Sequence, residues 1–334
     1  MYAIAKAQAG LRLGYVGVAG RVPVIGVSSI QQFEALGVDH RFVLRDNEHL
    51  CGICFSFSED GERTMLTHAG VNEFMADYID REFTNIVTYL SGARVIHVTS
   101  FLDSRTAGRI LKMLQAVKTV NRGTLICFDP GHVWSVDPAQ EIQGIVRISD
   151  YLLVNYREFR ELGEYRSDDS NDDVAARLLG RFDSERSVII VKRPTGIWSY
   201  WREGEKIISD FYPQVPLPLE EVEDATGAGD VFAAGLLIVL TNDKLQVELG
   251  SLLGMRLPGT NYDTSAAPAM RSSPRSRRIS SVHSTPNGVP AYNQKGCSLP
   301  TVRIPSGWPS SVSSKNDSSC QCTRLRAVHG AGAK

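Results

Sequence analysis

The stretch EDATGAGDVFAAG, residues 223–235, places a carboxylate, Asp230, at the junction between a flexible Gly-Ala-Gly and an apolar run. The run VFAAGLLIVL, residues 231–240, predicts a buried helix that begins near Gly227. The first N–H groups of a helix have no partner within the helix and lie at the positive end of its dipole. Gly227, Ala228 and Gly229 therefore predict a site that binds an anion such as phosphate.

Asp230 lies in the first turn of this expected helix, and two interpretations of it are open. A bound phosphate repels a carboxylate, so an acid here has a use if a proton must be removed. Asp230 would then be the general base for a hydroxyl group that attacks a γ-phosphoryl group. Alternatively, the helix dipole alone favours an acid in the first turn by roughly 0.3–1 kcal/mol. No G-x-x-x-x-G-K-[ST] occurs in the chain, which argues against a P-loop enzyme.

Strand-like and helix-like segments alternate between about residues 90 and 240. Buried strand patterns are found at residues 94–100, 124–129, 151–154 and 187–192. Helical patterns follow Asp103-Ser104 and occupy residues 171–182. This alternation predicts an α/β fold with a parallel sheet and helices on its faces.

Residues 40–70 carry a different pattern, made of short β segments at 41–45, 50–58 and 63–68. The last two segments are joined through Glu59-Asp60-Gly61, which is typical of a hairpin turn because glycine accepts a positive φ. A small β-sheet beside an α/β body would suit a lid.

The last 80 residues differ from the rest in composition. Residues 255–334 contain 8 of the 15 prolines and 15 serines, but only 10 Leu, Ile, Val and Phe residues. They carry 11 Lys and Arg against 2 Asp and Glu. Because so little apolar surface cannot offset the entropy of ordering, this composition predicts a disordered, basic tail.

The bulk composition limits the partners and the compartment. The first 254 residues carry 25 Lys and Arg against 35 Asp and Glu, so nothing in this acidic body indicates nucleic-acid binding. The N-terminus MYAIAKAQAGLRLG has no continuous apolar segment of the kind found in a secretory signal. The chain contains no run of about 18 apolar residues, which is the pattern that would predict a membrane span. We therefore expect a reduced, cytoplasmic protein.

The stretch Asp224-Ala-Thr-Gly-Ala-Gly-Asp230 closely resembles the C-terminal signature of the PfkB (ribokinase-like) carbohydrate kinase family. Further matches follow in the order of that family. Asn155-Tyr-Arg-Glu158 resembles its N-x-x-E motif, Asp60–Arg63 with Ala69–Asn72 its lid strand and the following segment, Phe128–Pro130 its central strand end, and Val188–Lys192 with Gly196 its nucleotide-side strand and loop. The resemblance covers roughly residues 5–254.

The resemblance implies a three-layer α/β/α kinase domain over residues 1–254, with a mainly parallel sheet and a lid at about 40–70. Asp230 would be the catalytic base, and Gly227, Ala228 and Gly229 would form the anion hole. The remaining roles are these: Asn155, Thr226 and Gly196 would bind the nucleotide, Glu158 would help to bind Mg²⁺ through water, and Asp224 would help to hold a monovalent cation such as K⁺, as in some members.

The same resemblance implies transfer of phosphate from ATP, with Mg²⁺, to a hydroxymethyl group of a monosaccharide or sugar acid. Ribose, fructose and 2-keto-3-deoxygluconate are all open as acceptors, and so is a nucleoside. A homodimer formed through the lid is also open, because lid sheets often pair in this family.

Both ends of the chain depart from the family pattern. Ala3–Gly14 resembles the helix that normally follows the first strand and its Gly-Gly-x-x-Asn motif, so these sugar-binding elements have no counterpart. After Leu252–Arg256 the tail replaces the helices that complete the adenine pocket. In the loop Lys192–Gly196, Pro194 removes a donor N–H. The alternative is therefore a degenerate or truncated member that binds a nucleotide or a partner without catalysis.

Overall fold

The computed structural model describes residues 4–5, 10–23, 28–59, 62–214 and 227–242, all of which belong to one compact unit. Asp224 and Thr226 lie outside the described residues, as does the tail from residue 255 to 334. The disorder expected for that tail stays a prediction.

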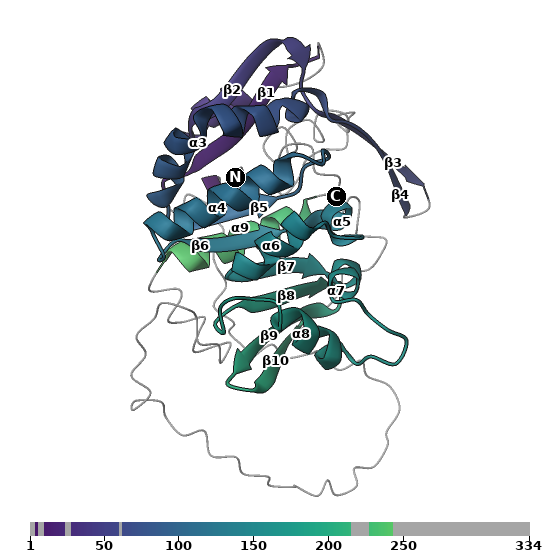
Figure 1. The fold of residues 1–334 in the computed structure, drawn as a ribbon. Coiled ribbons are helices and arrows are strands. Elements are labelled where there is room, and N and C mark those ends of the chain that lie inside the picture. The colour runs from purple at the N-terminus through teal and green to yellow at the C-terminus, as the bar shows by residue number, and fades with distance from the viewer. Residues whose placement is uncertain (1–3, 6–9, 24–27, 60–61, 215–226, 243–334) are drawn as a thin grey trace, which may run out of the picture. The chain divides into compact units, whose positions relative to one another are not determined.

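A six-stranded sheet forms the centre of the fold, in the order β10-β9-β8-β7-β6-β5 (Figure 1). Its strands are β5 (Val95–Thr99), β6 (Leu125–Asp129), β7 (Tyr151–Asn155), β8 (Val188–Arg193), β9 (Gly196–Glu203) and β10 (Lys206–Pro213). Strands β5 to β8 are parallel, whereas β9 and β10 pair antiparallel at the edge. The predicted α/β fold with a mainly parallel sheet is confirmed.

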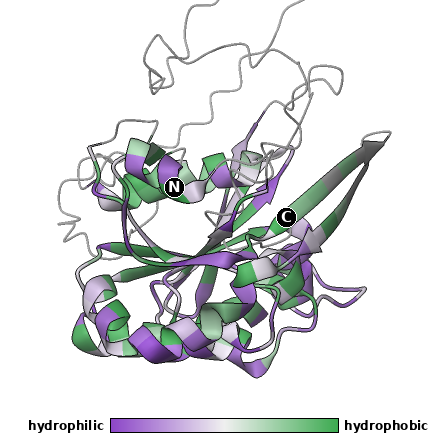
Figure 2. Cartoon of the chain, turned by 90° about the horizontal axis from the view of Figure 1, so that it is seen from above, coloured by the Kyte–Doolittle hydropathy of each residue, from purple (hydrophilic) through white to green (hydrophobic). Residues whose placement is uncertain are grey.

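Helices cover both faces of this sheet, as Figure 2 shows. The helices are α2 (Ser29–Ala35), α3 (Met75–Ser91), α4 (Thr106–Val120), α5 (Gly131–Ser135), α6 (Gln140–Ile148), α7 (Tyr156–Leu162), α8 (Asn171–Leu179) and α9 (Ala228–Thr241), with a 3₁₀ helix at Gly70–Phe74. Alternate residues of β7 enter two separate cores. Leu152 and Val154 pack with the large helical layer, and Tyr151 and Leu153 pack with α9. Because both faces are covered, the inner strands are continuous apolar runs.

The region before the sheet contains two further pairs of strands. β1 (Gly14–Arg21) runs parallel to β2 (Asp39–Leu50), and β3 (Ile53–Glu59) forms a hairpin with β4 (Glu62–His68). The hairpin projects away from the sheet (Figures 1 and 2). The sequence interpretation missed β1 and placed a single small sheet at 40–70, whereas the structure divides it into two sheets. In the segment 3–14, helix is described only at Ile4 and Ala5, and Gly14 already begins β1.

None of the helices in the described parts of the chain combines the length and the hydropathy that a membrane span requires.

Candidate active site

The strands β6, β7 and β8 end at one edge of the sheet, and their last residues are polar or charged. Asp129 ends β6 with 1% of its surface exposed, and its Oδ2 accepts a hydrogen bond from Lys192 Nζ at 3.2 Å. This ion pair crosses β7, which lies between β6 and β8. Asn155 ends β7 opposite Lys192 in the strand register and is exposed. In open α/β sheets, ligands bind outside the carboxyl ends of the parallel strands.

Asn155 and Glu158 form a reciprocal cap at the start of α7. The Asn155 Oδ1 accepts from the Glu158 N–H, and Glu158 Oε2 accepts from the Asn155 N–H, both at 2.9 Å. This is a capping box, and it satisfies two N–H groups that the helix leaves unpaired. Glu158 is only 3% exposed, so it is not a surface acid. The cap fixes both side chains at the carboxyl end of β7.

The N-terminus of α9 has the geometry that the opening stretch predicts. Gly227 is the residue before the helix and has a φ of +85°, a left-handed conformation that glycine adopts without a Cβ clash. Its carbonyl accepts the Val231 N–H at 2.9 Å, which closes the first helical turn. Asp230 lies in this turn and is half-buried. Gly227, Ala228 and Gly229 thus place N–H groups at the positive end of the helix dipole.

Packing against the sheet holds α9 in place. The buried residues of this helix are Ala233, Ala234, Leu237 and Leu240, and they share a core with Cys127, Tyr151 and Leu153. In Figure 1 the helix passes behind β5 and β6, and its N-terminal end lies on the side of α5 and α7. The helix is not buried all round, because Val231 is 59% exposed. Packing of one apolar face is enough to hold the N-terminus of the helix on the side of the sheet where the parallel strands end.

Gly196 has a structural explanation of its own. It begins β9 with a φ of +148°, and a Cβ at this position would lie 2.3 Å from the carbonyl oxygen of Tyr212. Arg193 and Gly196 face each other across a tight turn made of Pro194 and Thr195. The glycine is therefore required by the hairpin, whatever the turn binds.

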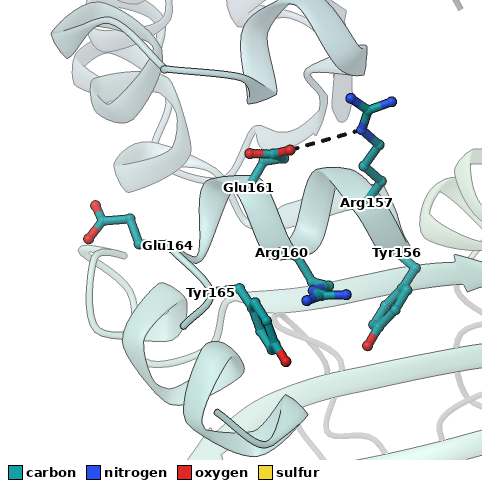
Figure 3. A pocket seen from close by; sticks show the side chains of 6 residues that line it. All are labelled: Tyr156, Arg157, Arg160, Glu161, Glu164 and Tyr165. Atoms are coloured by element: carbon teal, nitrogen blue, oxygen red, sulfur yellow. Dashed lines mark ion pairs between the residues drawn. The ribbon is translucent and has the colours of Figure 1, made fainter. Parts of the chain in front are cut away.

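The structure also brings together residues that the sequence interpretation did not assign to the site. The guanidinium carbon of Arg193 lies 3.5 Å from the centre of the Tyr156 ring, and that of Arg160 lies 5.6 Å from the same ring. Arg160 also lies 3.5 Å from the ring of Tyr165 (Figure 3). Arg160 borders a surface pocket of about 340 Å³, which is lined by Tyr156, Arg157, Arg160, Glu161, Glu164 and Tyr165. A basic residue at the end of a predicted buried strand was the only sequence signal for Arg193.

The described residues contain no group of three or more His, Cys, Asp or Glu side chains that could hold a metal ion. Mg²⁺ beside phosphates often keeps several waters and takes only one or two carboxylates from the protein.

A model of the pfkB family carbohydrate kinases matches residues 2–252. An uncharacterized sugar kinase of Archaeoglobus fulgidus is 26% identical over 250 residues, which cover 73% of this chain and 88% of that protein. The 2-dehydro-3-deoxygluconokinase of Haemophilus influenzae is 23% identical over 242 residues, with 69% of this chain and 73% of the relative covered.

Solved structures show the same fold. The structure of an E. coli ribokinase II candidate in complex with ATP and Mg²⁺ superimposes with a TM-score of 0.56 at 18% sequence identity. The superposition covers 73% of this chain and 76% of that chain. The fold is therefore ribokinase-like, with an α/β body, a mainly parallel sheet and small additional strand pairs.

Proposed function

Because the chain belongs to the pfkB family of carbohydrate kinases, we propose that it transfers the γ-phosphoryl group of ATP to a hydroxyl group of a monosaccharide or sugar acid. The observation that carries this proposal is the N-terminus of α9. It combines a left-handed Gly227, the N–H groups of the first turn and the half-buried carboxylate of Asp230.

Asp230 is the general base in this proposal. Its carboxylate takes the proton of the acceptor hydroxyl, whose oxygen then forms a bond to the γ-phosphorus while the bond to the β-phosphate oxygen breaks. The products are the sugar phosphate and ADP. The N–H groups of Gly227, Ala228 and Gly229 stabilise the negative charge on the transferring group. A preorganised donor set of this kind needs no rearrangement during the reaction.

Mg²⁺ supplies charge neutralisation at the phosphates when it is bound. Asn155 and Glu158 fit a supporting role, because their reciprocal cap fixes an amide and a carboxylate at the strand edge. Since the cap already engages one oxygen of each side chain, we assign them to waters around the ion. Asn155, Gly196 and Thr226 are assigned to the nucleotide, and Asp224 to a monovalent cation such as K⁺.

The acceptor is assigned only to its chemical class. The Haemophilus influenzae relative phosphorylates a sugar acid according to its name, and the Archaeoglobus fulgidus relative is described only as a sugar kinase. We therefore propose a sugar or sugar acid of the ribose, fructose or 2-keto-3-deoxygluconate type. A domain of residues 1–254, followed by the basic tail, and a cytoplasmic location complete the proposal.

The test is release of ADP from Mg²⁺-ATP across a panel of sugars, sugar acids and nucleosides. In the Asp230→Asn variant we expect acceptor-dependent turnover to fall by about 10²–10⁴-fold, the usual effect of losing a general base. Asp172→Asn is the matched control, because Asp172 is an exposed acid in the first turn of α8. It removes the same charge from a helix N-terminus without changing any residue that the proposal assigns to the reaction.

The outcomes separate the two interpretations of Asp230. Equal, small effects of both variants would mean that Asp230 acts only on the helix dipole. If a folded wild-type chain shows no ADP release that depends on an acceptor, the result would instead favour a family member that binds nucleotide or a partner without catalysis.

A homodimer formed through the β3–β4 hairpin is a further part of the proposal. Phe55 lies opposite Leu66 in the hairpin register, and their surfaces are 55% and 60% exposed. Phe57, two residues along the same strand, is 55% exposed. Within the described residues this hairpin is a sheet of two strands only. Such hairpins are marginally stable alone, so an apolar partner would stabilise this one.

A further inference from the structure

At the carboxyl ends of β7 and β8, the guanidinium group of Arg193 stacks on the ring of Tyr156. Arg193, the last residue of β8, lies with its guanidinium carbon 3.5 Å from the ring centre, as expected for a cation–π contact. Tyr156 is itself fixed, because its hydroxyl donates to Asn171 Oδ1 at 3.3 Å and Arg160 lies on it at 5.6 Å. Arg193 therefore stacks on a ring whose position is fixed by other contacts.

The charge of Arg193 is not balanced by any carboxylate in the described part of the chain. Its Nε and Nη2 are buried and have no hydrogen-bond partner there. Nη1 is not among the buried nitrogens that lack a partner, and no hydrogen bond from it is found in the described residues, so this nitrogen is the exposed part of a half-buried side chain. A positive charge that is held at a partly buried place, with no counter-ion, attracts an anion more strongly than one in open water.

Most charged side chains near Arg193 are paired. Lys192 is held by Asp129 at 3.2 Å. Around the pocket beside Tyr156, Arg157 pairs with Glu161 at 3.9 Å (Figure 3). Glu164 pairs with Arg181 at 2.6 Å, so both acids that line the pocket are engaged. Arg160 is the other stacked cation without an ion pair in the described residues. Two unbalanced cations thus flank Tyr156.

The turn that follows Arg193 offers few backbone donors. Pro194 has no N–H, so this turn has one backbone donor fewer than a turn made of other residues. A side-chain donor beside the turn would replace the N–H that proline lacks. The exposed Nη1 of Arg193 carries two N–H groups that can donate to phosphate oxygens, and the guanidinium stays charged.

We propose that Arg193, held flat on Tyr156, binds the phosphate chain of the nucleoside triphosphate. The proposal rests on the proposed kinase function, because the turn lies beside Asn155 at the same sheet edge. Arg193 supplies by its side chain the donors that the turn lacks in its backbone.

The experiment measures dissociation constants of ATP, ADP, AMP and adenosine with Mg²⁺ by titration calorimetry, using the full chain. Arg193→Gln removes the charge, and Arg193→Lys keeps the charge without the planar fork. Arg157→Gln is the matched control, because it removes a positive charge from the neighbouring helix α7 at a side chain that is 71% exposed. Turnover across the acceptor panel is measured in parallel.

We expect Arg193→Gln to weaken ATP binding by about 10- to 100-fold, the usual effect of losing charge-assisted hydrogen bonds. Arg193→Lys should lose less, Arg157→Gln should stay within about twofold, and adenosine binding should not change. Unchanged ATP binding in Arg193→Gln would overturn the inference and leave the proposed function intact. An equal loss for adenosine, or a changed KM for the acceptor alone, would also overturn it. A wild-type chain that binds no ATP would contradict the proposed function itself, and this inference with it.

Discussion

Tyr200 shows how one residue ties the pH dependence of stability to the neighbourhood of the site. It lies in β9 with 1% of its surface exposed, and its ring stacks on Phe159 at 5.6 Å. The pKa of Tyr200 is raised to about 12, mainly by burial and also by the charge of Asp172, while Arg193 opposes the shift. The hydroxyl therefore stays protonated in the folded protein at a pH where the unfolded chain has lost its proton.

The raised pKa predicts a loss of stability in alkali. Below the unfolded-state pKa of about 10 the contribution is fully present, and it is lost as the pH rises from there through about 12. Between these limits we expect the free energy of unfolding of the wild type to fall more steeply than that of Tyr200→Phe. The expected difference is on the order of 2 kcal/mol. Urea unfolding at a series of pH values measures it.

Other tyrosines titrate in the same range, which is why the comparison with Tyr200→Phe is needed. Burial also raises the pKa of Tyr89 to about 12, and it raises the pKa of Tyr151 still more. Both remain in the variant, so they cancel. Parallel curves for the two proteins would show that Tyr200 ionises in the folded state as readily as in the unfolded chain.

At the start of α7, the contribution of Glu158 to stability can be measured separately from its proposed role beside Mg²⁺. Its capping box uses Glu158 as an acceptor for the Asn155 N–H, and glutamine performs the same task in such boxes. We therefore expect Glu158→Gln to leave the free energy of unfolding within about 1 kcal/mol of the wild type. If the carboxylate also orders water around Mg²⁺, the apparent Mg²⁺ requirement of the kinase should rise by about tenfold.

A second capping box provides the control. Ser170 and Asp173 form the same reciprocal cap at the start of α8. Asp173→Asn should alter stability comparably and leave the Mg²⁺ requirement unchanged. A Glu158→Gln enzyme with the wild-type Mg²⁺ requirement would restrict Glu158 to its structural role.

Elements with a strong local signal could be predicted from the sequence. The strands β5 to β8 are short apolar runs between polar segments, and α9 begins directly after Gly227, close to where the sequence predicts its start. β1 could not be predicted in the same way, because two of the eight residues of GYVGVAGR are interior glycines, which are unfavourable in strands. Its pairing with β2 depends on tertiary packing.

The site divides in the same manner. Gly227 and Asp230 are candidates because of their immediate neighbours, and Asn155 and Glu158 because of a four-residue motif, whereas the reciprocal cap between the last two was not predicted. The contact of Lys192 with Asp129 joins residues that are 63 positions apart, and it exists only because β6, β7 and β8 end side by side. The stacking of Arg193 on Tyr156 also depends on that strand order. Contacts of this kind follow from topology rather than from composition.

At the scale of the whole molecule, the β3–β4 hairpin carries a group of exposed apolar side chains among the described residues. Three large side chains on it, Phe55, Phe57 and Leu66, are each at least 55% exposed. An exposed strand edge with apolar side chains pairs readily with another chain. A second copy of this chain offers the same surface, and a twofold axis would bring the two hairpins together.

We therefore expect the wild-type chain to sediment as a dimer at micromolar concentration, and the double variant Phe55→Ser, Phe57→Ser to sediment as a monomer. Val120→Ser is the control, because Val120 ends α4 and is 68% exposed on another element. It should remain dimeric. Sedimentation velocity over a range of concentrations measures both states, and far-ultraviolet circular dichroism verifies that each variant is folded. A monomeric wild type, or a dimer that survives loss of both phenylalanines, would mean that the hairpin is not the interface.

Because a hairpin of two strands is marginally stable alone, the monomeric variant should also be cut by protease within residues 53–68 faster than the wild type.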